Sequence, residues 1–412
     1  MNIEEIVYEQ INRRLAKLCE FTATPDNGVT RLPFSEEGRQ AAEYLKNEMQ
    51  DAGMTAYIDL VGNVRGVLKA TAENAKTILI GSHYDTVKNG GMYDGIAGVV
   101  CAISIAQMLK QYCNVRNYDV EVIAFNDEEG MMFGSGCLGS KSLTGQVDKE
   151  YLKLTDENGI SIREWIERWG ENPEDIHKQK IDLDNYSAFY EIHIEQGPVL
   201  DKQKKEIGIV TGIVGLIRCM VTVYGRADHA GTTPMDMRKD PMCIASEVIS
   251  KLPTIAGDEN NGAVATCGFI RAYPNAMNVI AHTVEFTIDY RSMSADSIAN
   301  MESKINKILD EETKKCGASY DIDVKLRQEP VYMDCGIIRG LTDMCSEHGY
   351  KYRTLPSGAA HDAMIFADKI PTAMVFAPSK DGRSHCKEEH SSCSDLAKAV
   401  QIVFDNIYDC IM

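Results

Sequence analysis

A histidine and two aspartates stand close together directly after a short apolar run of the sequence. The stretch GSHYDTVKNGGMYDG, residues 81–95, follows the apolar residues 78–80 and carries His83, Asp85 and Asp94 within twelve positions. Apolar strands often end in turn residues, so the glycines alone are ordinary. An imidazole and carboxylates in a loop at the end of a strand are typical of a metal site or of an acid–base site, and this stretch alone leaves both open.

Three further stretches place histidine, aspartate and glutamate beside short apolar segments. Imidazole with carboxylate, and almost no cysteine, is the ligand set of catalytic zinc, manganese, cobalt or nickel sites rather than of structural zinc. Successive carboxylates beside an apolar core are also costly without a cation. Open α/β sheets place ligands outside the carboxyl ends of their strands, where these stretches would meet. The stretches are NDEEG at residues 126–130, EIHIEQG with His193 and Glu195, and SKDGRSHCKEEH with His385, Glu389 and His390.

Each feature also has an ordinary structural interpretation when it is considered alone. A lone histidine beside a strand is more often a hydrogen-bonded structural residue than a ligand, and a DEE run is usually a solvated turn. His361, in SGAAHDAM, could simply cap the helix that follows it. Because independent accidents would not all fall beside short buried strands, the combined pattern predicts a metal site. One shared carboxylate would let such a site hold two divalent ions a few ångströms apart.

Composition and charge restrict the classes of partner. The chain has 412 residues, with 43 lysines and arginines against 61 aspartates and glutamates, and a formal net charge of −18. Such an acidic surface repels phosphate backbones and anionic membranes, so we expect neither nucleic acid nor membrane as a partner. We find no apolar signal-peptide core or membrane-spanning stretch in the sequence. Thirteen cysteines without a CxxC pair favour free thiols in a cytoplasmic protein.

Two kinds of strand pattern occur along the sequence. Residues 77–80, 122–125 and 373–376 are short and continuously apolar, which is typical of a parallel sheet covered on both faces by helices. Residues 216–224 and 283–291 instead alternate between apolar and polar side chains. Such alternation predicts an antiparallel sheet with one wet face.

The positions of these strands predict that one domain is inserted into another. We expect an α/β domain, formed by residues 1–209 and 326–412, with a mixed, largely parallel-cored sheet flanked by helices. Residues 95–110 are apolar on nearly all sides, so their helix should lie against this sheet. Residues 210–325 should form an inserted α+β domain that carries the antiparallel sheet.

Several long motifs follow one another in a fixed order. They are GSHYDTVKNGGMYDG, NDEEG, EIHIEQGPVL, GRADHAGTTPM, YPNAMNVI, DYR, SGAAHDAM and GRSHCKEE. In this order they resemble the M20-type metallohydrolases, and the resemblance runs from about residue 25 to the end of the sequence. HIEQGP together with DHAGTTPM makes the sequence similar to the branch of N-carbamoyl-L-amino acid hydrolases, β-ureidopropionases and allantoate amidohydrolases, rather than to peptidases and aminoacylases.

The resemblance implies a role for each residue that matches a family motif. It makes Glu128 the general base and Asp85 the residue that fixes the orientation of the His83 imidazole. Glu128 and its neighbour Glu129 would then divide the work, one handling the proton and the other binding metal. The implied ligands of two divalent ions, zinc or else manganese, cobalt or nickel, are His83, Asp94 and His193 for one ion and Asp94, Glu129 and His385 for the other.

The same resemblance implies a homodimer and a set of substrate contacts. His229 lies in the domain that we expect to be inserted, and in the family this residue reaches the active site of the partner subunit. Dimerisation through that domain would let His229 stabilise the tetrahedral intermediate. A guanidinium fork such as that of Arg291 suits an α-carboxylate. The implied substrate-binding residues are Gln196, His229, Asn278, Arg291, Gly358 and Ala359.

The reaction implied is hydrolysis of the ureido C–N bond of an N-carbamoyl-L-amino acid or a related ureido acid, with release of ammonia and CO₂. Allantoate is the first alternative substrate, because LRQEPVYMD resembles the allantoate enzymes. A dipeptidase, an N-acyl amino acid hydrolase and a non-catalytic ligand-binding relative are further alternatives, although an unligated Glu128 beside intact metal ligands argues against the last.

The sequence departs from the family pattern at two places. Met131 and Met132 stand where relatives commonly have a small residue and then arginine, which puts a transfer of substrate preference in doubt. His390 stands where relatives tend to have an aromatic or other residue, and we expect it to be an extra hydrogen-bonding group rather than a metal ligand. Neither departure touches the implied ligands.

Overall fold

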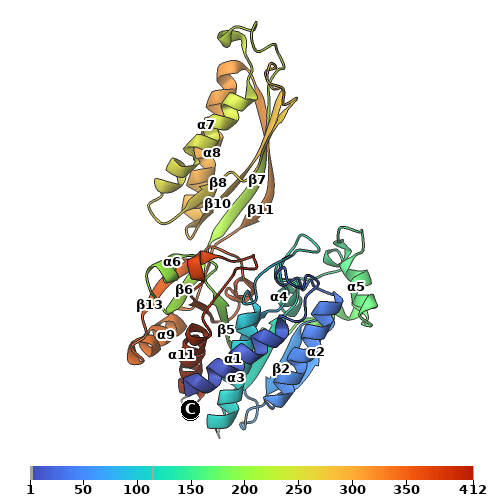
Figure 1. The fold of residues 1–412 in the computed structure, drawn as a ribbon, viewed down its shortest axis with the longest axis vertical. Helices are drawn as coiled ribbons and strands as arrows, with labels where there is room; N and C mark the ends of the chain where they lie inside the picture. The colour runs from blue at the N-terminus through green and yellow to red at the C-terminus, as the bar shows by residue number, and fades with distance from the viewer. Residues whose placement is uncertain (1–2, 114–115, 412) are drawn as a thin grey trace. The chain divides into compact units, whose positions relative to one another are not determined.

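The computed structural model describes residues 3–113 and 116–411, and the chain divides into two compact units (Figure 1). One unit runs to Thr211 and resumes at Tyr332, and the other spans Gly212–Val331. The sequence placed the corresponding boundaries after residues 209 and 325. Each unit has its own apolar core.

The larger unit is built on a sheet that has nine strands in the described residues. The strands are β1 (Thr55–Ile58), β2 (Val64–Leu68), β3 (Thr77–His83), β4 (Asp119–Phe125), β5 (Tyr186–Ile194), β6 (Ile207–Ile213), β12 (Val331–Tyr332), β13 (Tyr352–Ser357) and β14 (Thr372–Ala377). β4, β3, β5 and β14 lie next to one another in this order and are parallel. Antiparallel pairs extend the sheet through β2 and β1 on one side and β6 on the other. The predicted parallel-cored sheet is confirmed.

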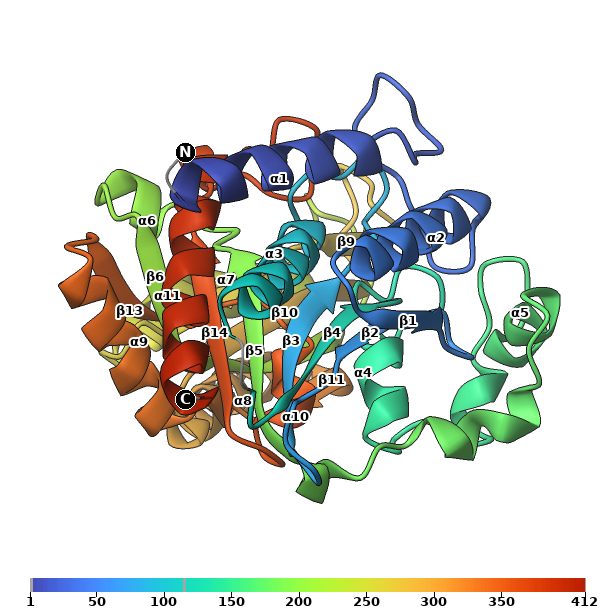
Figure 2. The ribbon, with the colours of Figure 1, turned by 90° about the horizontal axis from the view of Figure 1, so that it is seen from below.

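Helices cover both faces of this sheet. The helices of the unit are α1 (Ile3–Leu18), α2 (Glu36–Asp51), α3 (Ile96–Tyr112), α4 (Leu138–Leu143), α5 (Ile162–Arg168), α6 (Val199–Lys202), α9 (Cys335–Glu347), α10 (Ala363–Phe366) and α11 (Cys393–Ile411), with short 3₁₀ turns η1 (Tyr151–Lys153), η2 (Pro173–Gln179), η3 (Leu183–Asn185) and η5 (Lys380–Gly382). α1, α3 and α11 pack side by side over one face, as Figure 2 shows. Phe366 of α10 packs against Phe125 and Phe189 on the opposite face. No described helix has both the length and the apolar character that a membrane span needs.

Alternation within the central strands assigns their side chains to these two faces. In β5, Tyr190 and Ile192 join the apolar core beneath α1, α3 and α11, whereas Glu191 and His193 lie on the side of α10. All four side chains are buried. The helix predicted at residues 95–110 is α3, which is buried on nearly every side against the sheet.

The smaller unit carries a separate antiparallel sheet, as the alternating pattern predicted. Its strands are β7 (Gly215–Tyr224), β8 (Val264–Thr266), β9 (Ile270–Tyr273), β10 (Thr283–Ser292) and β11 (Ser319–Gln328), and its helices are η4 (Met235–Met237), α7 (Pro241–Gly257) and α8 (Ala295–Cys316). The strand order is β11-β7-β10-β8, and β9 also pairs with β10. Alternate residues of β10, such as Phe286 and Ile288, are buried in the core that α7 and α8 share.

The parallel strands of the larger unit bring four of the noted stretches to one edge of the sheet. His83 is the last residue of β3, and NDEEG begins directly after β4. His193 is the penultimate residue of β5, and β14 leads into the loop that carries His385. Because parallel strands point the same way, their carboxyl ends and the following loops meet at this edge.

We predict that Gly98 is required for the close approach of α3 to β5. A Cβ atom at Gly98 would lie 1.9 Å from the backbone oxygen of Ile192 and 2.8 Å from Cβ of Ser82. Gly98→Ala should therefore lower the free energy of unfolding by about 1–3 kcal/mol, measured by chemical denaturation. Gly257→Ala in α7 is the matched control, because an added Cβ there meets no atom within 4 Å. That variant should gain about 0.4–1 kcal/mol, and equal effects of both substitutions would contradict the prediction.

Candidate metal centre

Asp94 lies at the centre of a cluster of histidines and carboxylates at the carboxyl edge of the sheet. Its Oδ1 is 3.5 Å from Nε2 of His193, and its Oδ2 is 3.1 Å from Nε2 of His385. Nε2 of His83 is 3.3 Å from Nε2 of His193. A single buried carboxylate therefore faces imidazoles that come from the ends of two strands and from one loop.

Two sets of potential metal ligands share Asp94. Within each set, the candidate ligand atoms lie within 4.8 Å of one another, close enough to hold one cation between them. Glu129 joins the second set through Oε1, which is 3.5 Å from Nε2 of His385. The structure thus brings together the five residues that the sequence suggested as ligands. The sets are His83, Asp94 and His193, and Asp94, Glu129 and His385.

The loops at this edge adopt a left-handed backbone at several residues that are not glycine, among them Asp127, Gln196 and His385. The φ angle is 61° at Asp127, 56° at Gln196 and 56° at His385. This conformation costs a non-glycine residue about 1–3 kcal/mol and persists only where surrounding contacts impose it. Asp127 directly precedes Glu128, so the strained turn after β4 helps to aim both glutamates of NDEEG.

Asp85 ties the loop after β3 to the loop after β4. Its carboxylate accepts hydrogen bonds from the backbone N–H groups of Glu128, at 3.0 Å, and Glu129, at 3.3 Å. Nδ1 of His83 lies 3.0 Å from the backbone oxygen of Asp85 but 3.7 Å from its carboxylate. The ring of His83 is therefore held by the main chain of Asp85, the residue that the resemblance implied for this role. Nε2 of the same ring is therefore the nitrogen that can bind a metal ion together with Asp94.

Crowding of buried acids controls the protonation of the cluster. Burial, followed by nearby carboxylates, raises the pKa of Glu129 to about 8 and also raises that of Glu128. Burial also opposes the charge of Asp94, but the hydrogen bond with His385 and the other imidazoles together lower its pKa. The same hydrogen bond raises the pKa of His385 to about 9. The acids repel one another, and the imidazole of His385 offsets part of this repulsion.

One oxygen of the cluster fits a bound cation in particular. Oε1 of Glu129 is buried and accepts no hydrogen bond from the described residues. A buried carboxylate oxygen without a donor is unfavourable, and a cation between the carboxylates would relieve both this cost and their repulsion. The donor set of imidazole and carboxylate suits zinc, manganese, cobalt and nickel. The residues present therefore fit divalent metal ions.

Gln196, which the sequence suggested as a substrate contact, lies against the shared carboxylate. Its side-chain Nε2 donates to Oδ1 of Asp94 at 3.0 Å and to Oδ2 at 3.1 Å. The same nitrogen is 3.3 Å from Nε2 of His385. The amide thus lies on the cluster itself, where it could also meet a substrate.

His361 lies beside the cluster, and its interpretation as a helix cap is wrong. Asp362 holds the N-cap position of α10, without a capping hydrogen bond from its side chain. His361 is buried, with its ring centroid 4.4 Å from that of His193 and its Nε2 2.8 Å from Oγ of Ser357. No other candidate metal ligand stands near His361 in the sequence, so its own segment did not indicate this contact with the cluster. The contact depends on residues of β5 and β13, which are distant in the sequence.

Gly358 and Ala359 form the turn that follows β13. The backbone N–H of Ala359 donates to Oγ of Ser357 at 3.1 Å, and Ser357 in turn contacts His361. The turn is therefore linked to the cluster through His361. Gly358 is exposed, and a Cβ atom there would meet no atom within 4 Å.

Glu389 has a role that sequence reasoning missed. Its Oε1 accepts the backbone N–H groups of Tyr93, at 2.9 Å, and Asp94, at 3.0 Å, while its Oε2 accepts the hydroxyl of Ser384 at 2.6 Å. It therefore fastens the Asp94 loop to the loop of His385. Its spacing of four residues from His385 was the available signal. His390 is exposed and contacts the hydroxyl of Tyr93 at 3.2 Å, outside both ligand sets.

Glu191 is a second residue that sequence reasoning missed. It is buried on the same side of β5 as His193, and its pKa is raised to about 8 by burial. Its carboxylate accepts hydrogen bonds from Ser82 and from the backbone of Ala363, both at 2.8 Å. Glu191 and His193 stand two residues apart in EIHIEQG, so a strand places both on the same face, and this spacing was the available signal. Further groups of close ligand atoms are Glu191, His193 and His361, and His83, Glu128 and Glu129.

His229 and Asn278, two of the suggested substrate residues, are neighbours in the smaller unit. The backbone N–H of Ala230 donates to the backbone oxygen of Asn278 at 3.0 Å. The backbone N–H of Gly231 donates to Nδ1 of His229 at 3.0 Å. Since Nδ1 accepts a hydrogen bond, the proton of the neutral ring is on Nε2. His229 is exposed and so presents the N–H group of Nε2 as a donor.

Arg291 lies on β10 of the smaller unit and is held by a carboxylate. Its Nε donates to Oδ1 of Asp289 at 2.7 Å, and a terminal nitrogen donates to Oδ2 at 3.0 Å. Arg218 of β7 pairs with the same carboxylate at 2.9 Å. Asp289 thus fixes the plane of the Arg291 guanidinium before any substrate binds.

Comparison with known proteins identifies the family. The model of Peptidase family M20/M25/M40 matches residues 79–409, and the chain belongs to this family. M20 hydrolases use divalent metals, in agreement with the ligand groups at the carboxyl edge of the sheet. The recognition made from the sequence motifs is confirmed.

The similar proteins cover nearly the whole chain. An N-carbamoyl-L-amino-acid amidohydrolase from Paenarthrobacter aurescens is 35% identical over 404 residues, 98% of each chain. An allantoate amidohydrolase from Escherichia coli strain K12 is 35% identical over 408 residues, 97% of each chain. The crystal structure of an amidase of the hydantoinase/carbamoylase family from Burkholderia multivorans gives a TM-score of 0.90 at 28% identity, over 98% of this chain and 97% of that one.

We predict that Glu389 positions the metal ligands. Glu389→Ala removes the acceptor of the Tyr93 and Asp94 N–H groups, so metal affinity should fall by about 10- to 100-fold. Affinity is measured by competition with a chromophoric chelator. Glu388→Ala is the matched control, because Glu388 is adjacent, exposed and forms an ion pair with Arg383 away from the cluster. Equal metal affinity of the two variants would contradict the prediction.

Proposed function

We propose that this protein hydrolyses the ureido C–N bond of an N-carbamoyl-L-amino acid and yields the free amino acid, ammonia and CO₂. One water is consumed: its oxygen adds to the carbamoyl carbon, and one C–N bond breaks as the leaving nitrogen takes a proton. The carbamate that remains then breaks its own C–N bond, takes up a proton on nitrogen and releases CO₂. The observation that supports this most is the pair of ligand sets around Asp94, with the glutamate Glu128 beside them. Relatives named for ureido hydrolysis add support.

Two divalent metal ions would be held by the two sets that share Asp94. When bound, such ions polarise a carbonyl oxygen and lower the pKa of a water molecule toward neutrality. We propose zinc, with manganese, cobalt and nickel as alternatives, because imidazole and carboxylate suit all four. The protein contributes the ligand positions, and Asp85 and Glu389 fix the loops that carry them.

Glu128 is the proposed general base. Its side chain is 8% exposed, and its Oε2 lies 3.9 Å from Nε2 of His83 at the edge of the cluster. Burial and then the charge of Glu129 raise its pKa, which suits a carboxylate that takes a proton from water and passes it to the leaving nitrogen. The hydrogen bond from its backbone to Asp85 keeps it in reach of the reaction.

Residues of the smaller unit would bind and polarise the substrate. Arg291, already oriented by Asp289, presents a planar cation suited to the carboxylate of a ureido acid. His229 carries its proton on Nε2 and so can donate to the oxygen that becomes negative in the tetrahedral intermediate. Asn278, next to His229, would add a further polar contact.

Allantoate is the second candidate substrate. The named allantoate amidohydrolase is as similar to this chain as the named carbamoyl-amino-acid enzyme, at 35% identity in both cases. Allantoate also has a carboxylate beside a ureido group, so Arg291 and the cluster could serve both molecules. Peptide and N-acyl bonds lack the terminal nitrogen of a ureido group and are less favoured.

An ammonia-release assay tests this proposal. The metal-loaded protein should release ammonia from N-carbamoyl-L-amino acids, and a chelator should abolish the release, because the ligand sets would be empty of metal. Restoring the metal should restore the activity. Hydrolysis of dipeptides or N-acetyl amino acids without any ureido activity would contradict the proposal.

Two adjacent substitutions separate the base from a metal ligand. Glu128→Gln should lower turnover by at least about 100-fold and keep the metal content, because it removes only the proton acceptor. Glu129→Gln should lower the metal content itself. Loss of metal in both variants would make Glu128 a ligand, as its group with His83 and Glu129 would allow, and would contradict its role as base.

We also propose a homodimer in which His229 acts in the active site of the partner subunit. The smaller unit exposes large apolar side chains, among them Met235 at 74%, Val264 at 52% and Ile270 at 48%, which contact between subunits would bury. A position in the cytoplasm is consistent with the described cysteines, which are all free thiols.

Mixing two inactive variants tests this arrangement. Glu128→Gln and His229→Ala each impair every site of their own dimers. If His229 acts across the interface, a mixed dimer has one site with both residues intact, so exchange of subunits should restore about a quarter of the activity of the natural protein. No recovery, despite mixed dimers seen by mass spectrometry, would place His229 in its own subunit.

A further inference from the structure

Arg31 is a buried cation with which no carboxylate pairs in the described part of the chain. It lies in the segment between α1 and α2, and only 1% of its surface is exposed. Its guanidinium instead donates hydrogen bonds to backbone oxygens, from Nε to that of Tyr84 at 2.6 Å and from a terminal nitrogen to that of Leu18 at 2.9 Å. A buried charge without a counter-ion is costly, so the groups around it must offset this cost.

The carboxyl end of α1 supplies part of that compensation. Leu18 is the last residue of α1, and the final carbonyl groups of a helix lack a partner within it and carry a partial negative charge. The same terminal nitrogen of Arg31 lies 3.5 Å from the backbone oxygen of Phe21, just beyond the helix. Burial lowers the pKa of Arg31, and nearby titratable groups, Cys19 first and then Asp85, act against this. Arg31 therefore joins the end of α1 to the loop after β3.

Tyr84, the residue that Arg31 holds, is fixed at each of its polar groups. Its backbone oxygen accepts the guanidinium, its backbone N–H donates to the backbone oxygen of Phe125 at 3.0 Å, and its hydroxyl donates to that of Gly62 at 2.8 Å. The side chain is fully buried. Tyr84 stands between the candidate ligand His83 and Asp85, whose carboxylate holds the loop after β4. The position of Tyr84 thus determines where both neighbours lie.

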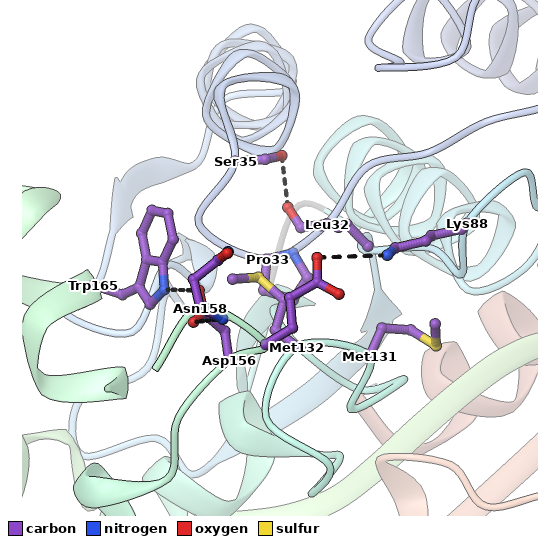
Figure 3. Close-up of a pocket in the computed structure, with 10 residues that line it drawn as sticks. Leu32, Pro33, Ser35, Lys88, Met131, Met132, Asp156, Asn158 and Trp165 are labelled. Carbon is purple, nitrogen blue, oxygen red and sulfur yellow. Dashed lines mark hydrogen bonds and ion pairs between the residues drawn. The ribbon is translucent and has the colours of Figure 1, made fainter. Parts of the chain in front are cut away.

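The main chain of Arg31 is fastened to the same loop. Its N–H donates to Oγ1 of Thr86 at 2.8 Å, and its oxygen accepts the N–H of Thr86 at 3.0 Å. The next residue, Leu32, lines a cavity of about 240 Å³ together with Met131 and Trp165, as Figure 3 shows. The segment of Arg31 is thus held between the loop after β3 and the residues that follow the NDEEG turn.

We infer that Arg31 is a positioning residue of the metal centre, because its guanidinium fixes the main chain at Tyr84 and thereby the ligand His83 and Asp85. None of its contacts in the described residues is to a candidate ligand atom. The inference rests on the divalent metal centre of the proposed function, and it is independent of which substrate that centre hydrolyses. If Arg31 only stabilised the fold, its loss would lower the free energy of unfolding without changing the metal affinity of the folded protein.

Two substitutions of Arg31 test the inference through affinity for zinc, measured by competition with a chromophoric chelator. Arg31→Met keeps a long apolar stem and removes every donor, so the affinity should fall by about 10- to 100-fold. Arg31→Lys keeps the charge, but a single ammonium group cannot replace the rigid fork that reaches two backbone oxygens. Its affinity should therefore fall by about tenfold. Circular dichroism verifies that each variant is folded at the temperature of the measurement, and Arg31→Lys decides if Arg31→Met does not fold.

Arg14→Met is the matched control. Arg14 is also buried, at 3% exposed, but it donates to Glu48 and Ser104 rather than to the loop after β3. This variant should lower the unfolding midpoint and keep the affinity for zinc within about threefold of the natural protein. Unchanged affinity in a folded Arg31 variant, or equal losses in Arg31→Met and Arg14→Met, would overturn the inference. Ammonia release by the natural protein would in that case leave the proposed function standing, so the two failures are distinguishable.

Discussion

The buried carboxylate of Asp94 is the element around which the larger unit is organised. It faces His193 on one oxygen and His385 on the other, so two sets of ligands meet at a single side chain. Glu128, Glu129 and Asp85 lie close by, and burial raises the pKa of each of these acids. So many acids in one place are costly together, and either bound protons, which their raised pKa values favour, or bound cations reduce this cost.

The loops are fastened by the same kind of contact at two places. Asp85 accepts the successive backbone N–H groups of Glu128 and Glu129, and Glu389 accepts those of Tyr93 and Asp94. In both cases a buried carboxylate holds the main chain of a neighbouring loop directly at a candidate ligand. Hydrogen bonds to ionised acceptors are among the stronger ones, so these two clamps order the centre independently of the metal. The parallel strands supply the rest, because they end at one edge of the sheet.

Much of this could be predicted from the sequence, and the reasons are physical. Continuous apolar runs revealed the parallel strands, and strict alternation revealed the antiparallel sheet of the smaller unit, as in β10. The pattern of imidazoles and acids beside buried strands indicated a metal site, and the resemblance to the M20 metallohydrolases implied which five residues are its ligands. Glu389 and His361 were missed because their roles depend on contacts with loops distant in sequence, which spacing along one segment does not encode. The pocket lined by Leu32, Met131 and Trp165 likewise requires segments distant in the sequence to meet.

The most direct test of this account is a crystal structure of the protein soaked with manganese, with anomalous diffraction used to locate the ions. Two anomalous peaks should lie on opposite sides of the Asp94 carboxylate, one next to His83 and His193 and the other next to Glu129 and His385. Peaks only at exposed acids, with Asp94 contacting no ion in a fully active protein, would contradict the shared-carboxylate centre.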